Sequence, residues 1–348
     1  MTIGALNAQF PRDPGPARAS APAPAAMRVL VTGASGAVGS LLAPRLVIGG
    51  HTVRAFGRDP GRIEEALDGQ LLEAEADEVE IVQGDVVTGA GLARALKAVD
   101  VAYYLMHSME RSAADPSPFT ERERLAAENF AAAAARAGVG RIVYLGGLVP
   151  RQDTADGLHR RSRHLASREA VERILLAAVP DSVALRASIV IGERSRSFRF
   201  LVRLVERMPV LTLPAWHSFR TQPIDARDIT EMLAAASTAE VSGRSLDVGG
   251  PDILTYGEMI TTIADVLLVN RPSLRFGVSA TPLAARVAAA IAREDPELVM
   301  PLMEGLQGDL LVPDDEAARL LGVELHSFVS AVERALGEWE DYEPLRAR

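Results

Sequence analysis

Seven residues close to the start of the chain have the spacing of a phosphate-binding loop. GASGAVG, over residues 33–39, has a GxxGxxG pattern that follows a β-branched run and precedes an apolar helical pattern. The first glycine permits a tight turn, the second lets the backbone approach a pyrophosphate, and the third lets helix and strand pack closely. The phosphates then lie on unpaired N–H groups at the helix N-terminus. We expect dinucleotide contacts from Gly33, Ser35, Gly36, Ala37 and Val38; the alternative is a tight turn that binds nothing.

The residues after the second β-branched run bear on which dinucleotide binds. NAD sites usually place Asp or Glu there to hold the ribose 2′-hydroxyl. This chain has RAFGR over residues 54–58 and no acid before Asp59. A guanidinium at Arg58 suits a 2′-phosphate, because it can make charge-assisted and often bidentate contacts. The sequence therefore favours NADP(H), with NADPH preferred over NADH. The alternative is that Arg58 is an ordinary surface arginine.

Alternating strands and helices position these residues. Short apolar runs predict strands over 27–33, 51–58, 78–85, 99–106, 141–148 and 182–192. Helical patterns lie between them, over 37–50, 91–98, 119–138 and 167–179. This alternation is typical of right-handed βαβ units and of a parallel sheet covered on both faces. The sequence thus predicts a doubly wound α/β fold with its ligand at the carboxyl edge of the sheet.

The chain divides into three expected parts. Residues 1–26 are rich in Pro and Ala, which predicts a disordered tail without the apolar stretch of a secretory signal. Residues 27–192 form the expected dinucleotide-binding core. The alternation breaks after Gly192, so 193–348 are expected to hold the last core elements interleaved with a small C-terminal substrate-binding cap.

Composition excludes several classes of protein. The chain has 348 residues, a net charge of −9 and no cysteine. Thiolate catalysis and cysteine-based metal sites are therefore excluded, and no His/Asp/Glu cluster indicates a metal. An acidic balance argues against nucleic acid as a partner, and no apolar stretch is long enough for a membrane helix. We expect a cytoplasmic monomer or homodimer whose partner is a small-molecule substrate.

Further motifs carry a family resemblance. TGASGAVG over 32–39, FGRDP over 56–60 and the Gly-Asp pair at 84–85 resemble the short-chain dehydrogenase/reductase superfamily, in its atypical, NmrA-like branch. YYLMHSM, YLGGL and HLASR resemble one bacterial subgroup of that branch, and the resemblance runs from residue 27 to about 312. It implies a Rossmann fold that binds NAD(P). It also places Asp85 and Val86 by the adenine, Leu105, Met106 and His107 by the ribose and nicotinamide, and Gly146 and Gly147 opposite them.

The chain departs from this superfamily at the catalytic motif. Active members use Tyr-x-x-x-Lys, but no tyrosine of this chain has a lysine four residues later, and Lys97 is the only lysine. His164 stands at the Tyr position and Arg168 at the Lys position, while a Gly-Gly pair at 146–147 replaces the usual serine. The resemblance therefore leaves the proton donor unassigned.

Two histidines are candidate proton donors. His164 suits proton transfer near neutral pH because an imidazole has an ordinary pKa of about 6.5, and Arg168, one helical turn on, would bind ribose hydroxyls or a phosphate. The alternative is that HRRSRH is a basic, solvated loop. His107 follows the fourth expected strand, where it is either catalytic or a structural histidine. Tyr104 is expected to pack in the sheet.

Three functions agree with these observations. The first is an NADP(H)-dependent oxidoreductase of a small, fairly apolar carbonyl or enone. The second is a non-catalytic NADP(H) sensor or scaffold, which the missing Tyr, Lys and Ser favour. The third is a non-redox lyase or isomerase that retains its cofactor. In the cap, the arginines at 196, 199, 203 and 207 predict a solvated helix face, with an anion or partner site as the alternative. Asp225 and Asp228 are expected to pair with arginines and to order the cap. Met208, Trp216 and Phe219 are either pocket walls or core.

Overall fold

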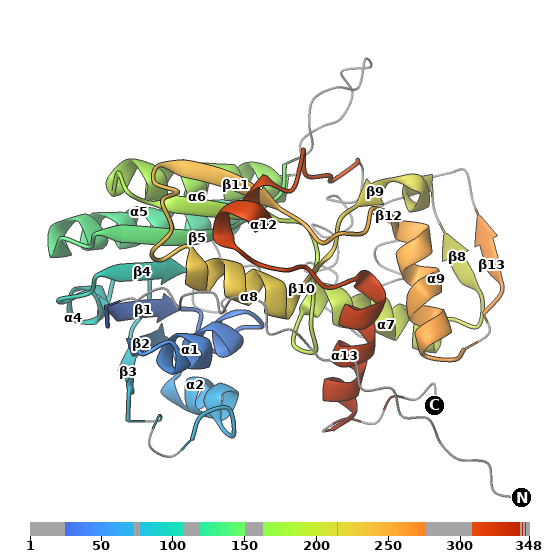
Figure 1. Cartoon of the computed structure of the whole chain (residues 1–348), viewed down its shortest axis with the longest axis horizontal. Helices are drawn as coiled ribbons and strands as arrows, with labels where there is room; N and C mark the ends of the chain where they lie inside the picture. The colour runs from blue at the N-terminus through green and yellow to red at the C-terminus, as the bar shows by residue number, and fades with distance from the viewer. Residues whose placement is uncertain are drawn as a thin grey trace, which may run out of the picture.

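The structure is a computed structural model. It describes residues 25–72, 75, 77–106, 119–149, 163–213, 215–269, 271–275, 308–341, 343 and 345. Almost all of the expected tail over 1–26 therefore lies outside the described residues. Figure 1 shows a sheet with its helices at one end of the molecule and a group of helices and short strands at the other.

The sheet has seven strands in the order β11-β6-β5-β4-β1-β2-β3. All six neighbouring pairs are parallel, which confirms the predicted doubly wound α/β fold. The strands are β1 (Arg28–Thr32), β2 (Thr52–Gly57), β3 (Val79–Gln83), β4 (Val101–Tyr104), β5 (Arg141–Gly147), β6 (Val183–Ala187) and β11 (Arg244–Val248). The strand order reverses between β1 and β4, and dinucleotides bind at such a switch point, beyond the carboxyl ends of the strands.

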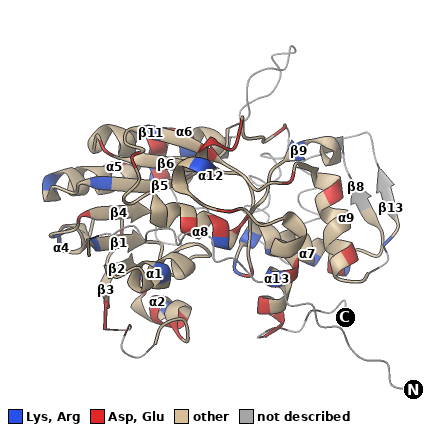
Figure 2. Cartoon of the chain, viewed as in Figure 1, with Lys and Arg blue, Asp and Glu red and all other residues tan. Residues whose placement is uncertain are grey.

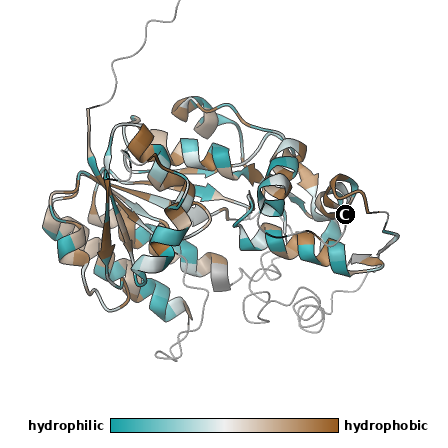
Figure 3. Ribbon diagram, turned by 90° about the horizontal axis from the view of Figure 1, so that it is seen from below, coloured by the Kyte–Doolittle hydropathy of each residue, from teal (hydrophilic) through white to brown (hydrophobic). Residues whose placement is uncertain are grey.

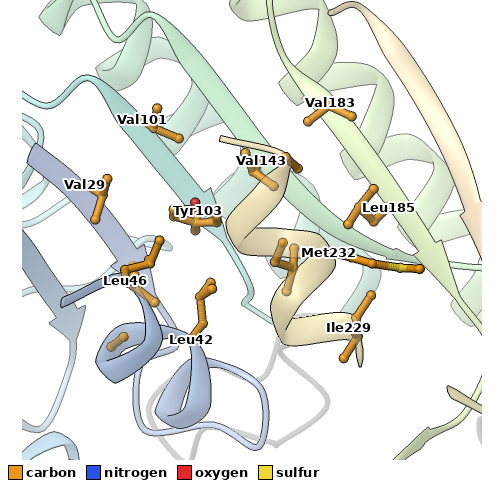
Figure 4. Packing of buried hydrophobic residues seen from close by; sticks show 14 of the residues in the cluster. Val29, Leu42, Leu46, Val101, Tyr103, Val143, Val183, Leu185, Ile229 and Met232 are labelled. Atoms are coloured by element: carbon orange, nitrogen blue, oxygen red, sulfur yellow. The ribbon is translucent and has the colours of Figure 1, made fainter. Parts of the chain in front are cut away.

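Helices cover both faces of the sheet. One face packs against α1 (Gly39–Ile48), α2 (Pro60–Leu67), α8 (Ala226–Ala235) and α12 (Glu316–Leu321). Figure 4 shows Leu42 and Leu46 of α1 beside Ile229 and Met232 of α8 on this face. The other face packs against α4 (Leu92–Ala95), α5 (Phe119–Ala137) and α6 (Arg163–Ala178). Figure 3 shows the apolar strands enclosed between helices that carry both apolar and hydrophilic residues, as expected of a sheet covered on both faces.

The run over 182–192, expected as one strand, is divided in two. β6 ends at Ala187, and the separate β7 (Val190–Ile191) pairs with β10 (Ile224–Asp225) outside the main sheet. The Ser188 hydroxyl donates to Gln222 O at 2.6 Å, and Ile224 N–H donates to Ile189 O at 2.9 Å. These bonds direct the chain away from the sheet and into the second part of the molecule.

That second part, which we call the cap, has its own apolar core. Its main helices are α7 (Arg196–Arg207), α9 (Tyr256–Val266) and α13 (Phe328–Glu340), whose buried residues belong to one cluster. Trp216 of the 3₁₀ helix η1 (Ala215–Ser218) is buried in this cluster, and Met208 and Phe219 pack against it. The remaining short strands are β8 (Leu211–Leu213), β9 (Arg220–Thr221), β12 (Leu254–Thr255) and β13 (Ser273–Arg275).

One of the arginines of α7, Arg203, does not lie on the solvated face that their spacing predicts. Arg203 is only 7% exposed, with Nη1 at 2.7 Å from Glu206 Oε2 and a second ion pair to Glu343. The guanidinium carbons of Arg199 and Arg203 lie 4.5 and 4.7 Å from the ring centre of Trp339. The prediction is wrong for Arg203 because the C-terminal helix covers it, which amphipathic spacing within α7 alone does not reveal.

No helix among the described residues has both the length and the apolar character to cross a membrane. Within the same ranges, no group of three or more His, Asp or Glu side chains is arranged to hold a metal ion.

Candidate cofactor-binding site

The glycine loop joins β1 to α1 in a tight turn that requires glycine at positions 33 and 39. Gly33 has φ +72°, in the left-handed region, and Gly36 N–H donates to Gly33 O at 2.9 Å. A Cβ at Gly39 would lie 2.8 Å from Gly33 C and 2.9 Å from Ala34 Cα, closer than real contacts allow. The loop therefore folds back against the start of α1, and the spacing of the glycines follows from this packing.

The N-terminus of α1 is arranged to accept an anion. Val38 occupies the N-cap position without a side-chain hydrogen bond, and the first turn contains no acidic residue. The first N–H groups of the helix therefore lack a capping side chain, and the helix dipole adds positive potential there. These residues fit a pyrophosphate, which would lie on the backbone of Ser35, Gly36, Ala37 and Val38.

An exposed arginine, Arg58, follows the end of β2, and the nearest acidic residue, Asp59, caps the next helix. Arg58 is exposed, and in the part of the chain that the structure describes its side chain forms no ion pair. Asp59 is the N-cap of α2, where its carboxylate accepts from Arg62 N–H at 3.3 Å. One oxygen of the Asp59 carboxylate is therefore engaged in capping α2.

The end of β3 is a rigid turn. The Asp85 carboxylate accepts from Val87 N–H at 2.7 Å, and its own N–H donates to Ala90 O at 2.9 Å. Asn129 of α5 donates from Nδ2 to Val86 O and Val87 O, at 3.2 and 2.7 Å. Val86 is buried beneath this turn. Asn129 thus positions the segment expected to lie by the adenine, a role the sequence analysis did not assign to it.

Thr32 joins the ends of β1 and β4. Its hydroxyl donates to Tyr103 O at 3.0 Å and accepts from Leu105 N–H at 3.2 Å. A Cβ at Gly33 would lie 3.1 Å from Leu105 O, so the glycine loop and the segment after β4 are in contact. The structure therefore brings together Gly33 and Leu105, two of the residues expected to contact the cofactor. Sequence reasoning missed Thr32, which is fully buried.

Arg168 of α6 lies under the carboxyl ends of β4 and β5. It is 8% exposed; Nη1 donates to Met106 O at 3.2 Å and Nη2 donates to Leu145 O. Its guanidinium carbon lies 5.2 Å from the ring centre of Tyr144, whose hydroxyl donates to Arg168 O at 3.3 Å. These contacts are to the protein backbone and to an aromatic ring, and a ribose or phosphate contact from Arg168 stays a prediction.

The tyrosines of the sheet are poor proton donors. Burial raises the pKa of Tyr144 to about 12, and burial also raises the pKa values of Tyr103 and Tyr104 well above their usual range. Tyr104 packs in the sheet as expected, with ring-centre distances of 4.9 Å to Phe130 and 6.1 Å to Tyr144. None of these three tyrosines is therefore suited to exchange a proton near neutral pH.

The two candidate histidines are not placed by the structure. His107 lies outside the described residues. His164 lies in the first turn of α6, and its side chain also lies outside what the structure describes. Their roles as proton donors stay predictions.

Two acidic residues at the start of α8 hold the cap. Asp225 is buried, and its carboxylate contacts Arg227 and Arg334, each at 2.7 Å. Asp228 accepts from His326 N–H at 2.7 Å, with Oδ1 at 2.6 Å from His326 Nδ1. Figure 2 shows acidic and basic residues together at the end of α8 nearest α13. The expected pairing with arginine holds for Asp225, whereas Asp228 binds a histidine.

Known proteins share this architecture. A profile of the NmrA-like family matches residues 25–263. The (4-alkanoyl-5-oxo-2,5-dihydrofuran-3-yl)methyl phosphate reductase of Streptomyces griseus is 31% identical over 271 residues, which cover 76% of this chain and 83% of that protein.

Solved structures show the same fold at lower identity. The Bordetella bronchiseptica enzyme WbmH, in complex with NAD⁺, superposes with a TM-score of 0.66 at 17% identity, over 91% of this chain and 100% of that one. The UDP-glucuronic acid 4-epimerase of Bacillus cereus, in complex with NAD, superposes with a TM-score of 0.66 at 16% identity, over 91% and 98%. With its parallel sheet, its glycine loop and the profile match, the chain belongs to the NmrA-like family and has its NAD(P)-binding Rossmann fold.

Proposed function

We propose that the chain is an NADPH-dependent reductase of a small carbonyl or enone compound. The observation that carries the NADPH preference is the end of β2, where Arg58 is exposed without an ion pair among the described residues while Asp59 caps α2. An unpaired guanidinium attracts a 2′-phosphate. Asp59, the nearest acid, has one carboxylate oxygen engaged in capping α2.

The reductase assignment is supported by the Streptomyces griseus relative. That protein is named as the reductase of a conjugated oxo-dihydrofuran carrying a methyl phosphate. Reduction of such a double bond needs a hydride at the β-carbon and a proton at the α-carbon, and the carbonyl accepts the charge that develops between the two steps. NADPH, when bound, would supply the hydride, and the proton must come from another source.

The chain's own residues bind and orient. The N-terminus of α1 holds the pyrophosphate, Arg58 holds the 2′-phosphate, and the segments after β4 and β5 form the wall beside the nicotinamide. The buried tyrosines do not supply the proton, because burial raises their pKa values. His164, His107 or a bound water supplies it instead.

Two measurements test this function. The first is calorimetric titration of nucleotide-free protein with NADPH, NADP⁺, NADH and NAD⁺; binding of the phosphorylated pair at least about tenfold tighter supports the Arg58 assignment. The second is incubation of a panel of enones and aldehydes with NADPH deuterated at the transferable position. A product that carries the deuterium at the β-carbon or the carbonyl carbon supports reduction. If the protein binds no nucleotide, the proposal is wrong.

A non-catalytic NADP(H) sensor is the second candidate function. The observation that favours it is the engagement of Arg168 with backbone carbonyls, together with the burial of Tyr144, since neither side chain is free for chemistry. A sensor must bind NADPH and NADP⁺ with different affinities to report their ratio. A large difference in the titration, with no deuterium transfer to any substrate of the panel, would favour the sensor over the reductase.

A further inference from the structure

The hydrogen-bonded ladder between β4 and β5 ends before the strands reach the site. The last paired residues are Tyr104 and Tyr144. Beyond that point β5 continues as far as Gly147 alongside β6, whereas the chain after β4 leaves the sheet at Leu105 and Met106. The backbone carbonyls of Met106 and Leu145 therefore lie where no strand pairing joins the two segments.

Arg168 provides the missing connection. Nη1 donates to Met106 O at 3.2 Å, and Nη2 of the same guanidinium donates to Leu145 O. On its other side, the segment after β4 is held to β1 by the Thr32 hydroxyl at Leu105 N–H. The chain beyond β4 is thus linked to β1 through Thr32 and to β5 through Arg168, and these side chains take the place of ladder hydrogen bonds.

The residues around Arg168 are shaped for this connection. A Cβ at Gly146 would lie 2.9 Å from Cε1 of Tyr144, so the glycine leaves room for the ring against which the guanidinium lies. A Cβ at Gly147 would lie 3.3 Å from Leu165 Cδ2 and 3.8 Å from Arg168 Cγ, so this glycine brings α6 close to β5. The Gly-Gly pair that replaces a serine therefore makes space for the arginine and its aromatic partner.

We propose that Arg168 is a positioning residue that holds the segment after β4 against the end of β5 in the arrangement that binds the nicotinamide half of the cofactor. The planar fork of a guanidinium can donate from two separate nitrogens to the carbonyls of Met106 and Leu145 while lying against the Tyr144 ring, whereas an ammonium donates from a single centre. The inference rests on the proposed NADP(H) binding, and it extends that proposal from the phosphates to the other half of the cofactor.

A binding series with two probes tests this role. Wild type, Arg168→Lys and Arg168→Met are titrated with NADPH and with 2′-phospho-ADP, which lacks the nicotinamide and its ribose. We expect the affinity for NADPH to fall in the order Arg, Lys, Met, by at least about tenfold at Met, while the affinity for 2′-phospho-ADP stays within about twofold. Arg173→Lys, at an exposed position of α6, is the matched control and should bind both probes like wild type.

The series separates fork geometry from charge and from folding. If Lys restores full NADPH affinity, Arg168 acts through its charge and the proposal is wrong. If both probes weaken equally in Arg168→Met, the effect is general destabilisation and the proposal is also wrong. If wild type binds 2′-phospho-ADP but not NADPH, the site takes no nicotinamide half and the positioning role falls with it.

Hydrogen exchange tests the connection without any cofactor. In cofactor-free Arg168→Met, amides over 105–106 and 145–148 should exchange at least about tenfold faster than in wild type, while those of β1 and β2 keep their rates. Unchanged exchange at both segments overturns the proposal even if cofactor binding is lost. Faster exchange in a protein that binds no nucleotide would support the connection while the proposed function fails.

Discussion

Arg334 of the C-terminal helix α13 contacts the buried carboxylate of Asp225 at the start of α8, with Nη2 at 2.7 Å from Oδ1. The Asp225 side chain is fully buried, and it also accepts from the backbone N–H and the side chain of Arg227. α8 packs on the sheet, whereas α13 belongs to the core of the cap. This ion pair therefore joins the two parts of the molecule, although its two residues lie 109 positions apart in the sequence.

Removing the arginine tests how much this contact stabilises the fold. Arg334→Met should lower the free energy of unfolding by about 2 to 3 kcal/mol, because Asp225 stays buried with only one of its cationic partners. Urea denaturation measures the change. Arg319→Met is the control: its pair with Asp315 is two-thirds exposed on both sides and contributes less than about 0.5 kcal/mol. Equal losses in the two variants would contradict a cap held by buried charge.

The same contact predicts a dependence of stability on pH. Burial alone would raise the pKa of Asp225, but hydrogen bonds from Arg227 and the positive charge of Arg334 outweigh it and hold the pKa below its ordinary value. The folded carboxylate thus stays ionised at pH values where the unfolded one, with a pKa of about 3.9, takes up a proton. Its contribution is complete above about pH 4 to 5 and is lost as pH falls through the folded pKa.

Asp225→Asn isolates that contribution. The variant should be less stable than wild type at neutral pH, and the difference should narrow as pH falls below about 4, because wild type alone must take up the proton. Unfolding free energies between about pH 3 and pH 7 measure it. Parallel curves for the two proteins would show that another carboxylate is responsible for acid sensitivity.

The close packing of the glycine loop predicts a severe effect at Gly39. An Ala at this position would place Cβ 2.8 Å from Gly33 C, against backbone that cannot swing aside. We expect a loss of about 1 to 3 kcal/mol in stability and of at least about tenfold in NADPH affinity. Gly337→Ala is the matched control, because nothing lies within 4 Å of its Cβ position in α13. It should raise stability by about 0.5 to 1 kcal/mol.

Much of the fold follows from the sequence because its determinants are local. The β-branched runs and the GxxGxxG spacing each fit within one strand–loop–helix unit, so pattern alone predicts the parallel sheet and the turn at Gly33. The long-range devices do not follow. Thr32 to Leu105, Arg168 to Met106 and Arg203 to Glu343 join residues more than sixty positions apart, and only the packing of complete elements brings them together.

In the candidate site, too, the residues set by local sequence could be predicted and those set by long-range contacts could not. Arg58 follows directly from its place at the end of a predicted strand, whereas Asp85 and Arg168 are identified in sequence only through the family resemblance. The break between β6 and β7 does not follow from the sequence, because SVALRASIVIG contains no glycine or proline before Gly192 that would mark the end of a strand. What ends β6 is a hydrogen bond from Ser188 to a residue on another element, Gln222, and periodicity within the run contains no sign of it.

Arg58 should determine the choice between the two dinucleotides. Arg58→Gln should weaken NADPH binding by about 10-fold to 100-fold, the loss of a charge-assisted contact to the 2′-phosphate, and leave NADH binding unchanged. Calorimetry at fixed ionic strength measures both. Arg136→Gln is the control. This exposed arginine of α5 lies just before the start of β5, near the amino ends of the strands and away from the carboxyl ends where the cofactor is expected. An equal loss for NADPH and NADH in Arg58→Gln would contradict the assignment.

The two histidines can be separated by chemical rescue. If His164 donates the proton, His164→Ala should lower kcat by about 10²-fold to 10⁴-fold and keep the NADPH affinity of wild type, because its imidazole gives a proton to the substrate and does not hold the cofactor. Added imidazole should restore part of the rate in this variant and none in His107→Ala. The reverse pattern would transfer the role to His107. Wild-type turnover in both variants would show that a bound water supplies the proton.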